Sequence, residues 1–172
     1  FNNFKNAFEL KYIEEEISSL KNKLMLDIGS GTGHHCEMFK SQGYTCEGLD
    51  KSQAMINKAK ENYPDIKFNL GDGLNTMLFD PNKFGLITML YFTIYYIENK
   101  KQIFQNCFDW LDNGGYFVLH LVDKDLFDPM VPSSTSLTLV SLQDYAKERI
   151  TKSNVVFNNF KYKSHFVLEE FK

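Results

Sequence analysis

The sequence predicts an α/β domain that is doubly wound around a mostly parallel sheet. Short apolar segments alternate with helix-like segments through connections of a few residues, and acids or glycines follow several of the apolar segments. Such alternation produces parallel strands joined by right-handed crossovers, with helices on both faces of the sheet. Ligands of these sheets bind at the carboxyl ends of the strands. The acids and glycines should therefore share one edge.

The first half of the chain is predicted to alternate between helices and strands. Apolar residues recur at steps of three and four between Leu10 and Leu20, which indicates a helix with one buried face. The next apolar segment is short and ends in a glycine turn, as is typical of a strand buried on both faces. Ser52 occupies the N-cap position of a later helix. The predicted order is helix 10–20, strand 23–28, helix 34–42, strand 45–49, helix 52–61 and strand 66–70.

The second half continues the pattern less regularly. An apolar run at 84–92 predicts the fourth strand, and a helical stripe at 103–111 stops at Asn113-Gly114-Gly115. Residues 116–122 supply the fifth strand. Ser141 to Asp144 has the form of a capping box that opens a short helix, and 155–168 is strand-like.

Length and composition indicate one globular domain with a substantial core. The chain has 172 residues, of which 43% are hydrophobic, and a formal net charge of −3. This charge argues against a nucleic-acid partner, which requires a concentrated basic face. We expect a single domain over 1–172, with a covering helix in 1–22, a cofactor-binding core in 23–123, and a substrate-side and C-terminal strand region in 124–172.

Cysteine usage and hydropathy favour a cytoplasmic protein without a membrane partner. Cys36, Cys46 and Cys107 are odd in number and form no C-x-x-C pair, so we interpret them as reduced core thiols. No apolar run approaches the ~20 residues of a membrane span, and no signal-peptide pattern opens the chain. The four histidines form no metal-binding motif. The chain begins at Phe1, so whether it is a fragment stays open.

The segment from Asp27 to Gly33 reads "DIGSGTG" and predicts a ligand-binding turn. Alternate glycines allow positive φ angles and close approach of a ligand, and should leave backbone amides available. A dinucleotide fingerprint needs glycine or alanine where His34 stands, and no Gly-Lys-Ser/Thr of a Walker A loop is present. The Asp27 carboxylate would repel a pyrophosphate but attract an amine or a sulfonium. The turn therefore favours a ligand with positive charge.

This segment resembles the first motif of the class I S-adenosylmethionine-dependent methyltransferases. The likeness extends over roughly residues 10–123, since "GLDKSQAMINKAK", "GDG" and "WLDNGGYFVLH" are similar to later family motifs. The resemblance implies S-adenosyl-L-methionine as cofactor, with the turn holding its methionine part. It assigns the ribose hydroxyls to Asp50 and the adenine amino group to Asp72, and we expect the Lys51 stem to lie along the adenine. The predicted cofactor-binding residues are Asp27, Gly29, Ser30, Gly31, Gly33, Asp50, Lys51, Asp72, Gly73 and Leu90.

Two features depart from the family pattern. The fourth strand usually begins Phe-Asp, whereas "KFGLITMLYFTIYYI" keeps Phe84 but has Gly85 in place of the acid. The family normally finishes with an antiparallel hairpin, and this chain is expected to stop within or just after its first strand. We therefore expect the last strand of the sheet to be missing.

Several residues are candidates for a role near the acceptor. His34 and His35 begin a helix beside the turn, although histidines there are often simply exposed. His120 in the fifth strand is a general-base candidate, with a hydrogen-bonded core histidine as the alternative. Tyr91, Tyr95 and Tyr96 follow the fourth strand, where an acceptor would sit or where aromatic residues would pack. The catalytic residue stays unassigned, and no metal ligand is predicted.

The resulting hypothesis is methyl transfer to an oxygen, nitrogen or carbon atom of a small molecule by in-line displacement. The alternatives are an NAD(P)-dependent oxidoreductase on a similar sheet and a non-catalytic cofactor-binding scaffold. No Asn/Asp-Pro-Pro-Tyr motif follows Leu90, which argues against enzymes that methylate amino groups of DNA. The identity of the acceptor and the oligomeric state stay open.

Overall fold

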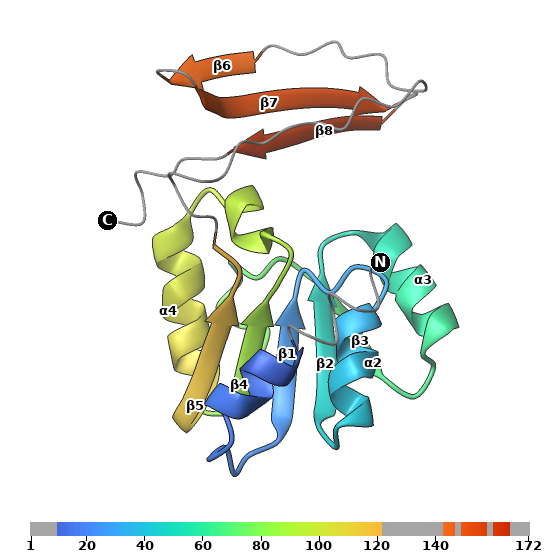
Figure 1. The fold of residues 1–172 in the computed structure, drawn as a ribbon. Coiled ribbons are helices and arrows are strands. Elements are labelled where there is room, and N and C mark those ends of the chain that lie inside the picture. The colour runs from blue at the N-terminus through green and yellow to red at the C-terminus, as the bar shows by residue number, and fades with distance from the viewer. Residues whose placement is uncertain (1–9, 122–142, 147–148, 158–159, 166–172) are drawn as a thin grey trace. The chain divides into compact units, whose positions relative to one another are not determined.

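The computed structural model describes residues 10–121, 143–146, 149–157 and 160–165 (Figure 1). The chain divides into two compact units, which are considered separately. The first comprises residues 1–93 and 99–120, and the second comprises residues 94–98 and 121–172.

The first unit is built on a five-stranded parallel sheet with strand order β3-β2-β1-β4-β5. Strands β2 and β3 lie on one side of β1, and β4 and β5 lie on the other side. The winding direction therefore reverses between β1 and β4. The predicted doubly wound α/β fold is therefore confirmed. The strands are β1 (Leu24–Ile28), β2 (Thr45–Asp50), β3 (Lys67–Leu70), β4 (Phe84–Met89) and β5 (Leu111–Leu119).

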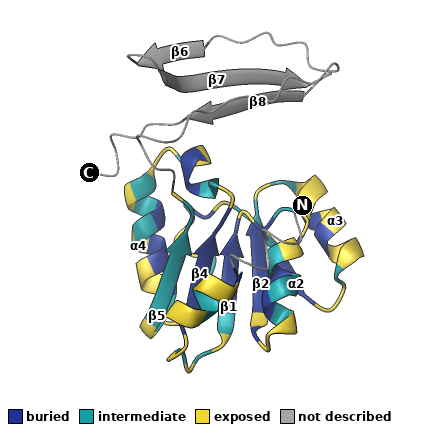
Figure 2. Cartoon of the chain, in the orientation of Figure 1, coloured by how far each residue is buried: buried dark blue, intermediate teal, exposed yellow. Residues whose placement is uncertain are grey.

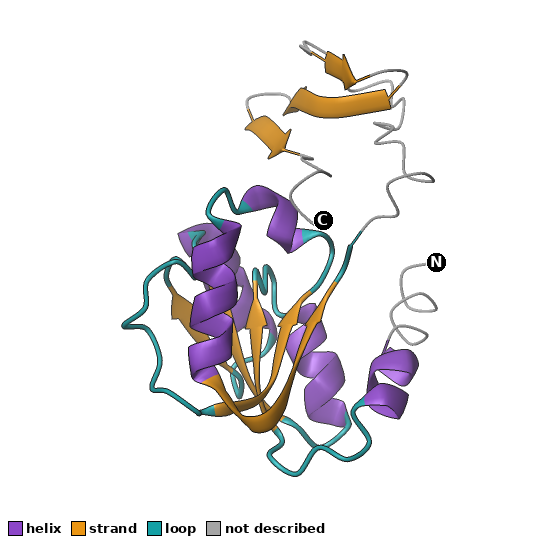
Figure 3. Cartoon of the chain, turned by 90° about the vertical axis from the view of Figure 1, so that its left-hand side faces the viewer, coloured by secondary structure: helices purple, strands orange, loops and turns teal. Residues whose placement is uncertain are grey.

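Helices cover both faces of this sheet, as Figure 3 shows. Residues 10–16 are helical, and the other helices are α2 (His34–Ser41), α3 (Gln53–Asn62), α4 (Lys100–Trp110) and the short 3-10 helix η1 (Thr93–Tyr96). Ser52 is the N-cap of α3, as predicted, and its Oγ accepts a hydrogen bond from the Met55 amide at 3.4 Å.

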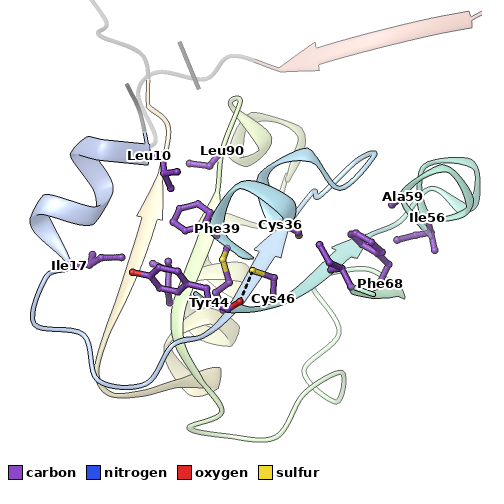
Figure 4. Close-up of a cluster of buried hydrophobic side chains, with 13 residues drawn as sticks. Leu10, Ile17, Cys36, Phe39, Tyr44, Cys46, Ile56, Ala59, Phe68 and Leu90 are labelled. Atoms are coloured by element: carbon purple, nitrogen blue, oxygen red, sulfur yellow. Dashed lines mark hydrogen bonds between the residues drawn. The ribbon is translucent and has the colours of Figure 1, made fainter. Parts of the chain in front are cut away.

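One face of the sheet packs against the first helix, α2 and α3 to form a hydrophobic core (Figure 4). Leu10 and Ile17 contribute to this core, which confirms the predicted buried face, although the helix ends earlier than predicted. Phe39 of α2 meets Tyr44 edge to face, with ring centroids 5.4 Å apart. On the opposite face, Phe104 of α4 packs against Phe117 at 5.8 Å. Strands β1, β2 and β4 are mostly buried and β5 is half-buried (Figure 2).

The second unit contains an antiparallel sheet of β6 (Gln143–Ala146), β7 (Arg149–Phe157) and β8 (Phe160–His165), in that order. The capping-box prediction is wrong where it can be checked, because residues 143–146 form a strand paired with β7. Ser141 lies outside the described residues. The region predicted as strand-like from 155 onward contains the end of β7 and all of β8, which pair as neighbours.

The fifth parallel strand also differs from its prediction. It begins at Leu111 and includes Asn113, Gly114 and Gly115, which were expected to form a turn before the strand. Pairing with β4 explains the extension, since Phe84 aligns with Leu111 and the register then shifts before Leu86. A β-bulge accommodates such a shift.

The glycine at position 85 has a structural reason. A Cβ at Gly85 would overlap the backbone carbonyl of Asn22. The side-chain Nδ2 of Asn22 donates to the Lys83 carbonyl at 3.3 Å and to Asp112 Oδ2 at 3.0 Å, and its Oδ1 accepts from the Leu24 backbone amide at 3.1 Å. Asn22 thus joins the starts of β1, β4 and β5, and the missing side chain at Gly85 leaves room for it.

Gly85→Ala should therefore lower the free energy of unfolding by about 2 kcal/mol, because the added methyl group must displace backbone. Urea unfolding of the free protein measures the change. Gly43→Ala is the control, because a Cβ at this position would meet nothing within 4 Å. Only the φ of +87° opposes this substitution. A residue with a Cβ in that conformation costs about 1 kcal/mol. A Gly85→Ala protein that is more stable than the control would contradict this account.

Candidate functional site

The glycine turn follows β1 directly and leads into α2. Gly29, Gly31 and Gly33 have φ angles of 75°, 53° and 87°. These lie in the left-handed region that residues with a Cβ rarely adopt, so the backbone of the turn favours glycine at all three positions. A Cβ would meet Thr93 at 2.5 Å at Gly29 and Phe68 at 2.5 Å at Gly33, but would meet nothing within 4 Å at Gly31. The turn is packed at its ends and open at its centre.

Most backbone amides of the turn are engaged within the protein, contrary to the sequence-based expectation. The amides of Gly29 and Ser30 donate to the Leu49 carbonyl at 2.8 and 3.1 Å. The Gly31 amide donates to Asp50 Oδ2 at 2.9 Å, and the Gly33 amide donates to the Ser30 carbonyl at 2.9 Å. Phosphate-binding turns direct such amides at the ligand. This geometry disfavours a pyrophosphate and hence a dinucleotide.

Asp50 connects the glycine turn with the start of α3. Its Oδ2 accepts from the Gly31 amide, and its Oδ1 accepts from the Ser52 amide at 2.8 Å. Each carboxylate oxygen has a further lone pair that can accept a hydrogen bond. Asp50 is therefore fixed in orientation and keeps acceptor capacity, while Lys51 next to it is exposed.

Asp72 and Gly73 follow β3 at the same edge of the sheet. Asp72 is exposed, and its Oδ1 accepts from the Leu74 amide at 3.0 Å. The Gly73 carbonyl accepts from Nδ2 of Asn106 at 2.7 Å, and Asn106 is buried. Sequence analysis missed Asn106, although an asparagine inside an apolar helical stripe was a signal that its side chain has a buried partner.

Asp27 is a buried carboxyl group beside the turn, with 1% of its surface exposed. Its Oδ1 accepts from the Thr88 hydroxyl at 2.7 Å, and its Oδ2 accepts no hydrogen bond from the described residues. Nδ1 of His35 lies 3.9 Å from that Oδ2. Burial raises the pKa of Asp27 from 3.8 to about 7, against the lowering effect of the Thr88 hydrogen bond and with a smaller contribution from the nearby Asp50 charge. A cation at the turn would stabilise the ionised form.

The three acids lie at one edge of the sheet. Asp27 is in β1, Asp50 ends β2, and Asp72 follows β3 by two residues. These strands are neighbours and parallel, so their carboxyl ends coincide. Figure 1 shows the strand arrowheads directed to this edge. Leu90, which is buried directly after β4, comes from the same edge.

Aromatic rings gather where β4 and β5 end. The Tyr91 ring lies 5.0 Å from that of His35 and 6.0 Å from that of His120, and the Phe92 ring lies 5.9 Å from His120. Tyr91 and Phe92 have positive φ angles of 48° and 63°. Consecutive bulky residues in this region are rare and concentrate at functional sites. Of the candidates named from the sequence, the fold thus brings His35, Tyr91 and His120 together, and Phe92 was missed.

The other candidates are placed differently. His34 is exposed at the start of α2, with its ring 6.0 Å from that of His35. Tyr95 is buried and Tyr96 is exposed, and both belong to the second unit.

A cavity of about 690 Å³ lies at the opposite edge of the sheet, between the segment 76–82 and the end of α4. It is lined by residues that precede β4 and by the start of β5, and none of the predicted site residues contributes to it. The cavity is therefore separate from the glycine turn.

Cys36, Cys46 and Cys107 are free and buried, which confirms their interpretation as core thiols. Within the described ranges, no three His, Cys, Asp or Glu side chains cluster closely enough to hold a metal ion. No helix in the same part of the chain has the length and hydropathy needed to cross a membrane.

Comparisons with known proteins give a consistent result. A family model described as a methyltransferase domain matches residues 25–115. The ubiquinone biosynthesis O-methyltransferase of Coxiella burnetii is 26% identical over 123 residues, which cover 70% of this chain and 52% of the relative. The phosphoethanolamine N-methyltransferase of Plasmodium falciparum is 29% identical over 150 residues, which cover 79% and 55%. The chain thus spans about half the length of these curated relatives.

Solved structures share the fold. The crystal structure of Streptomyces venezuelae DesVI superposes with a TM-score of 0.70 at 18% identity, over 94% of this chain and 77% of that one. At this identity the likeness supports the architecture alone.

Proposed function

This chain belongs to the class I S-adenosylmethionine-dependent methyltransferase family, and from this premise we propose that it transfers a methyl group from S-adenosyl-L-methionine to a small-molecule acceptor. The observation that carries the proposal is the turn at Gly29–Gly33. Most of its backbone amides are hydrogen-bonded within the protein, its centre is open, and buried Asp27 lies beside it. A turn of this kind suits a cationic ligand better than a phosphate.

The residues at this edge fit the cofactor. Asp27 Oδ2 is buried and accepts no hydrogen bond from the described residues, so a cationic group at the turn would stabilise its negative charge through the intervening side chains and not by direct contact. The open position at Gly31 allows the methionine part to approach the backbone beside Ser30. Asp50 would accept hydrogen bonds from the ribose hydroxyls, and Asp72 with Gly73 would meet the adenine amino group. The Lys51 stem would cover the adenine, and Leu90 would contribute apolar contact.

When bound, the cofactor supplies a methyl group made electrophilic by a sulfonium. The chain's own contribution is to orient both partners and to exclude water, because in-line displacement needs little covalent chemistry from the protein. The ring cluster of His35, Tyr91, Phe92 and His120 borders the turn and would form one wall of the acceptor site.

Ligand-induced stabilisation tests the cofactor assignment. S-adenosylhomocysteine at a hundredfold excess over its Kd should stabilise the fold by about 2.7 kcal/mol, which raises the Tm by about 5–10 °C. NADH should leave the Tm unchanged, because the occupied amides offer no pyrophosphate site. A response to NADH and none to S-adenosylhomocysteine would overturn the proposal.

Turnover separates an enzyme from a binding scaffold. We expect S-adenosylhomocysteine to form when the protein is supplied with S-adenosylmethionine and a panel of small amines, phenols and carbon acids. Cofactor binding without turnover on any of them would favour the scaffold alternative.

A further inference from the structure

Asn106 is a buried amide in α4, and both ends of its side chain have partners. Its Nδ2 donates to the Gly73 carbonyl at 2.7 Å, and its Oδ1 accepts from Nε2 of Gln102, one helical turn earlier, at 2.7 Å. A carbonyl oxygen can only accept a hydrogen bond, so the nitrogen of Asn106 must face Gly73. The oxygen of Asn106 then faces Gln102, which must donate. Two partners of opposite kind therefore fix the orientation of this amide.

The peptide unit between Gly73 and Leu74 connects Asn106 with Asp72. The carbonyl oxygen of this unit accepts from Asn106, and its N–H, the Leu74 amide, donates to Asp72 Oδ1 at 3.0 Å. Because a peptide unit is planar, its carbonyl and its N–H turn together. Hydrogen bonds in such a chain also polarise one another. Asn106 thus fixes the direction from which the N–H approaches the Asp72 carboxylate.

Packing against α4 buries Gly73 and leaves Asp72 exposed beside it. A Cβ at Gly73 would lie 2.8 Å from Cδ1 of Ile103, so the backbone at this position lies directly against the helix. Ile103 and Asn106 are three residues apart and share one face of α4. The same helix face therefore supplies an apolar contact and a hydrogen bond to Gly73. Of the two carboxylate oxygens of Asp72, only Oδ1 accepts a hydrogen bond from the described residues, which leaves Oδ2 for a ligand.

We propose that Asn106, oriented by Gln102, is a positioning residue for recognition of the adenine base. It holds the 73–74 peptide unit so that Asp72 presents Oδ2 to the amino group of the adenine. The inference rests on the proposed function, in which Asp72 meets this group. Without Asn106 the carboxylate keeps its charge but loses its fixed direction. The property that should change is therefore the preference for an amino group at this position of the base.

S-inosylhomocysteine tests this preference, because it differs from S-adenosylhomocysteine by a carbonyl in place of the adenine amino group. The wild type should bind S-adenosylhomocysteine about tenfold more tightly, the effect of one hydrogen bond to a carboxylate. Isothermal titration calorimetry measures both Kd values. A variant with a weakened fold loses affinity for both ligands alike, so the ratio of the two Kd values separates positioning from general structural support.

Two variants should reduce this ratio to about threefold or less. Asn106→Leu removes both hydrogen bonds at similar volume. Gln102→Glu replaces the donor by a carboxylate that repels Asn106 Oδ1, and the amide should turn so that its oxygen faces the Gly73 carbonyl. Gln102 is half-buried, so this variant still tests the proposal if Asn106→Leu fails to fold. Gln105→Glu is the matched control, because Gln105 is exposed in the same helix and its Nε2 donates to Asp109 Oδ1 at 2.9 Å.

Exchange of the Leu74 amide tests the link to Asp72 in the free protein. Its hydrogen bond to Asp72 Oδ1 should slow exchange with solvent, and loss of the Asn106 contact should weaken that protection. We expect exchange, followed by NMR, to be about tenfold faster in Asn106→Leu and Gln102→Glu than in the wild type. Gln105→Glu should exchange as the wild type does.

The results separate this role from the proposed function. An unchanged ratio of Kd values in both variants, or a wild type that binds the two ligands equally, would overturn the role of Asn106 and leave methyl transfer in place. Unchanged exchange of the Leu74 amide in both variants would overturn it as well. Failure of the wild type to bind S-adenosylhomocysteine would instead count against the proposed function, and the inference would fall with it.

Discussion

Asp50→Ala is expected to weaken the binding of S-adenosylhomocysteine about 100-fold. The substitution removes the carboxylate proposed to accept hydrogen bonds from the ribose hydroxyls. It also removes the acceptor of the Gly31 and Ser52 amides, which lie 2.9 and 2.8 Å from its oxygens. Hydrogen bonds to a charged group contribute about 1.5–3 kcal/mol each, and a loss of about 3 kcal/mol corresponds to this change in affinity.

Isothermal titration calorimetry measures the change directly. Asp50→Asn should be intermediate, because its amide oxygen still accepts hydrogen bonds but carries no charge. Asp80→Ala is the control, since Asp80 is an exposed acid that lines the cavity at the opposite edge of the sheet. Unchanged affinity in Asp50→Ala, with the fold intact by circular dichroism, would refute the assignment of Asp50.

The sequence predicts the parallel sheet well because its strands are locally encoded. Strand β4 is buried along its whole length, and the apolar run that begins at Phe84 is enough to identify it. Ser52 marks the start of α3 by capping chemistry that depends only on neighbouring residues. By contrast, the start of β5 depends on pairing with β4 across a register shift, and residues 143–146 form a strand by pairing with β7. Tertiary pairing overrides local preference in both cases.

The sequence likewise predicts some features of the candidate site and misses those that depend on distant partners. The glycine turn and the acids at the ends of β2 and β3 could be placed at one edge because the strands were predicted to be parallel. The occupied turn amides could not, because the partner of Gly31 is Asp50 and that of Ser30 is the Leu49 carbonyl. The hydrogen bond from the Tyr91 amide to Nδ1 of His120 joins residues 29 apart, which no local pattern encodes. The roles proposed for these residues stay predictions that the experiments above can test.

Asp27→Asn is expected to remove a large pH dependence of stability. Burial raises the pKa of Asp27 from 3.8 to about 7, so the folded protein holds this proton more tightly than the unfolded chain does. Well below pH 3.8 both states are protonated and the group has no effect. As pH rises from about 4 to about 7, the unfolded state loses the proton first and the fold is progressively destabilised. Above pH 7 the penalty is constant, at about 4 kcal/mol.

Urea unfolding from pH 4 to pH 9 tests this expectation. The free energy of unfolding of wild type minus that of Asp27→Asn should fall by about 4 kcal/mol between pH 4 and pH 7 and then level off. Subtracting the two free energies of unfolding removes the contributions of the other titrating groups. This requires that the groups facing Asp27 titrate in the same way in both proteins. They are Asp50, His35, Cys36 and Cys46. Asp72→Asn, the same substitution at an exposed carboxylate, is the matched control. A difference that is independent of pH would refute the account of Asp27.

The same carboxyl group links stability to cofactor binding. A cation at the turn favours the ionised form and lowers the pKa of Asp27, so S-adenosylmethionine should bind with release of a proton near neutral pH. Its affinity should rise with pH up to about 7 in the wild type and be flat in Asp27→Asn. The buried charge of Asp27 destabilises the free protein, and a bound cation offsets this cost. Above pH 7 the wild type should therefore bind the cation more tightly than Asp27→Asn does. The instability of the empty site and the affinity for a positively charged ligand would then have one physical origin.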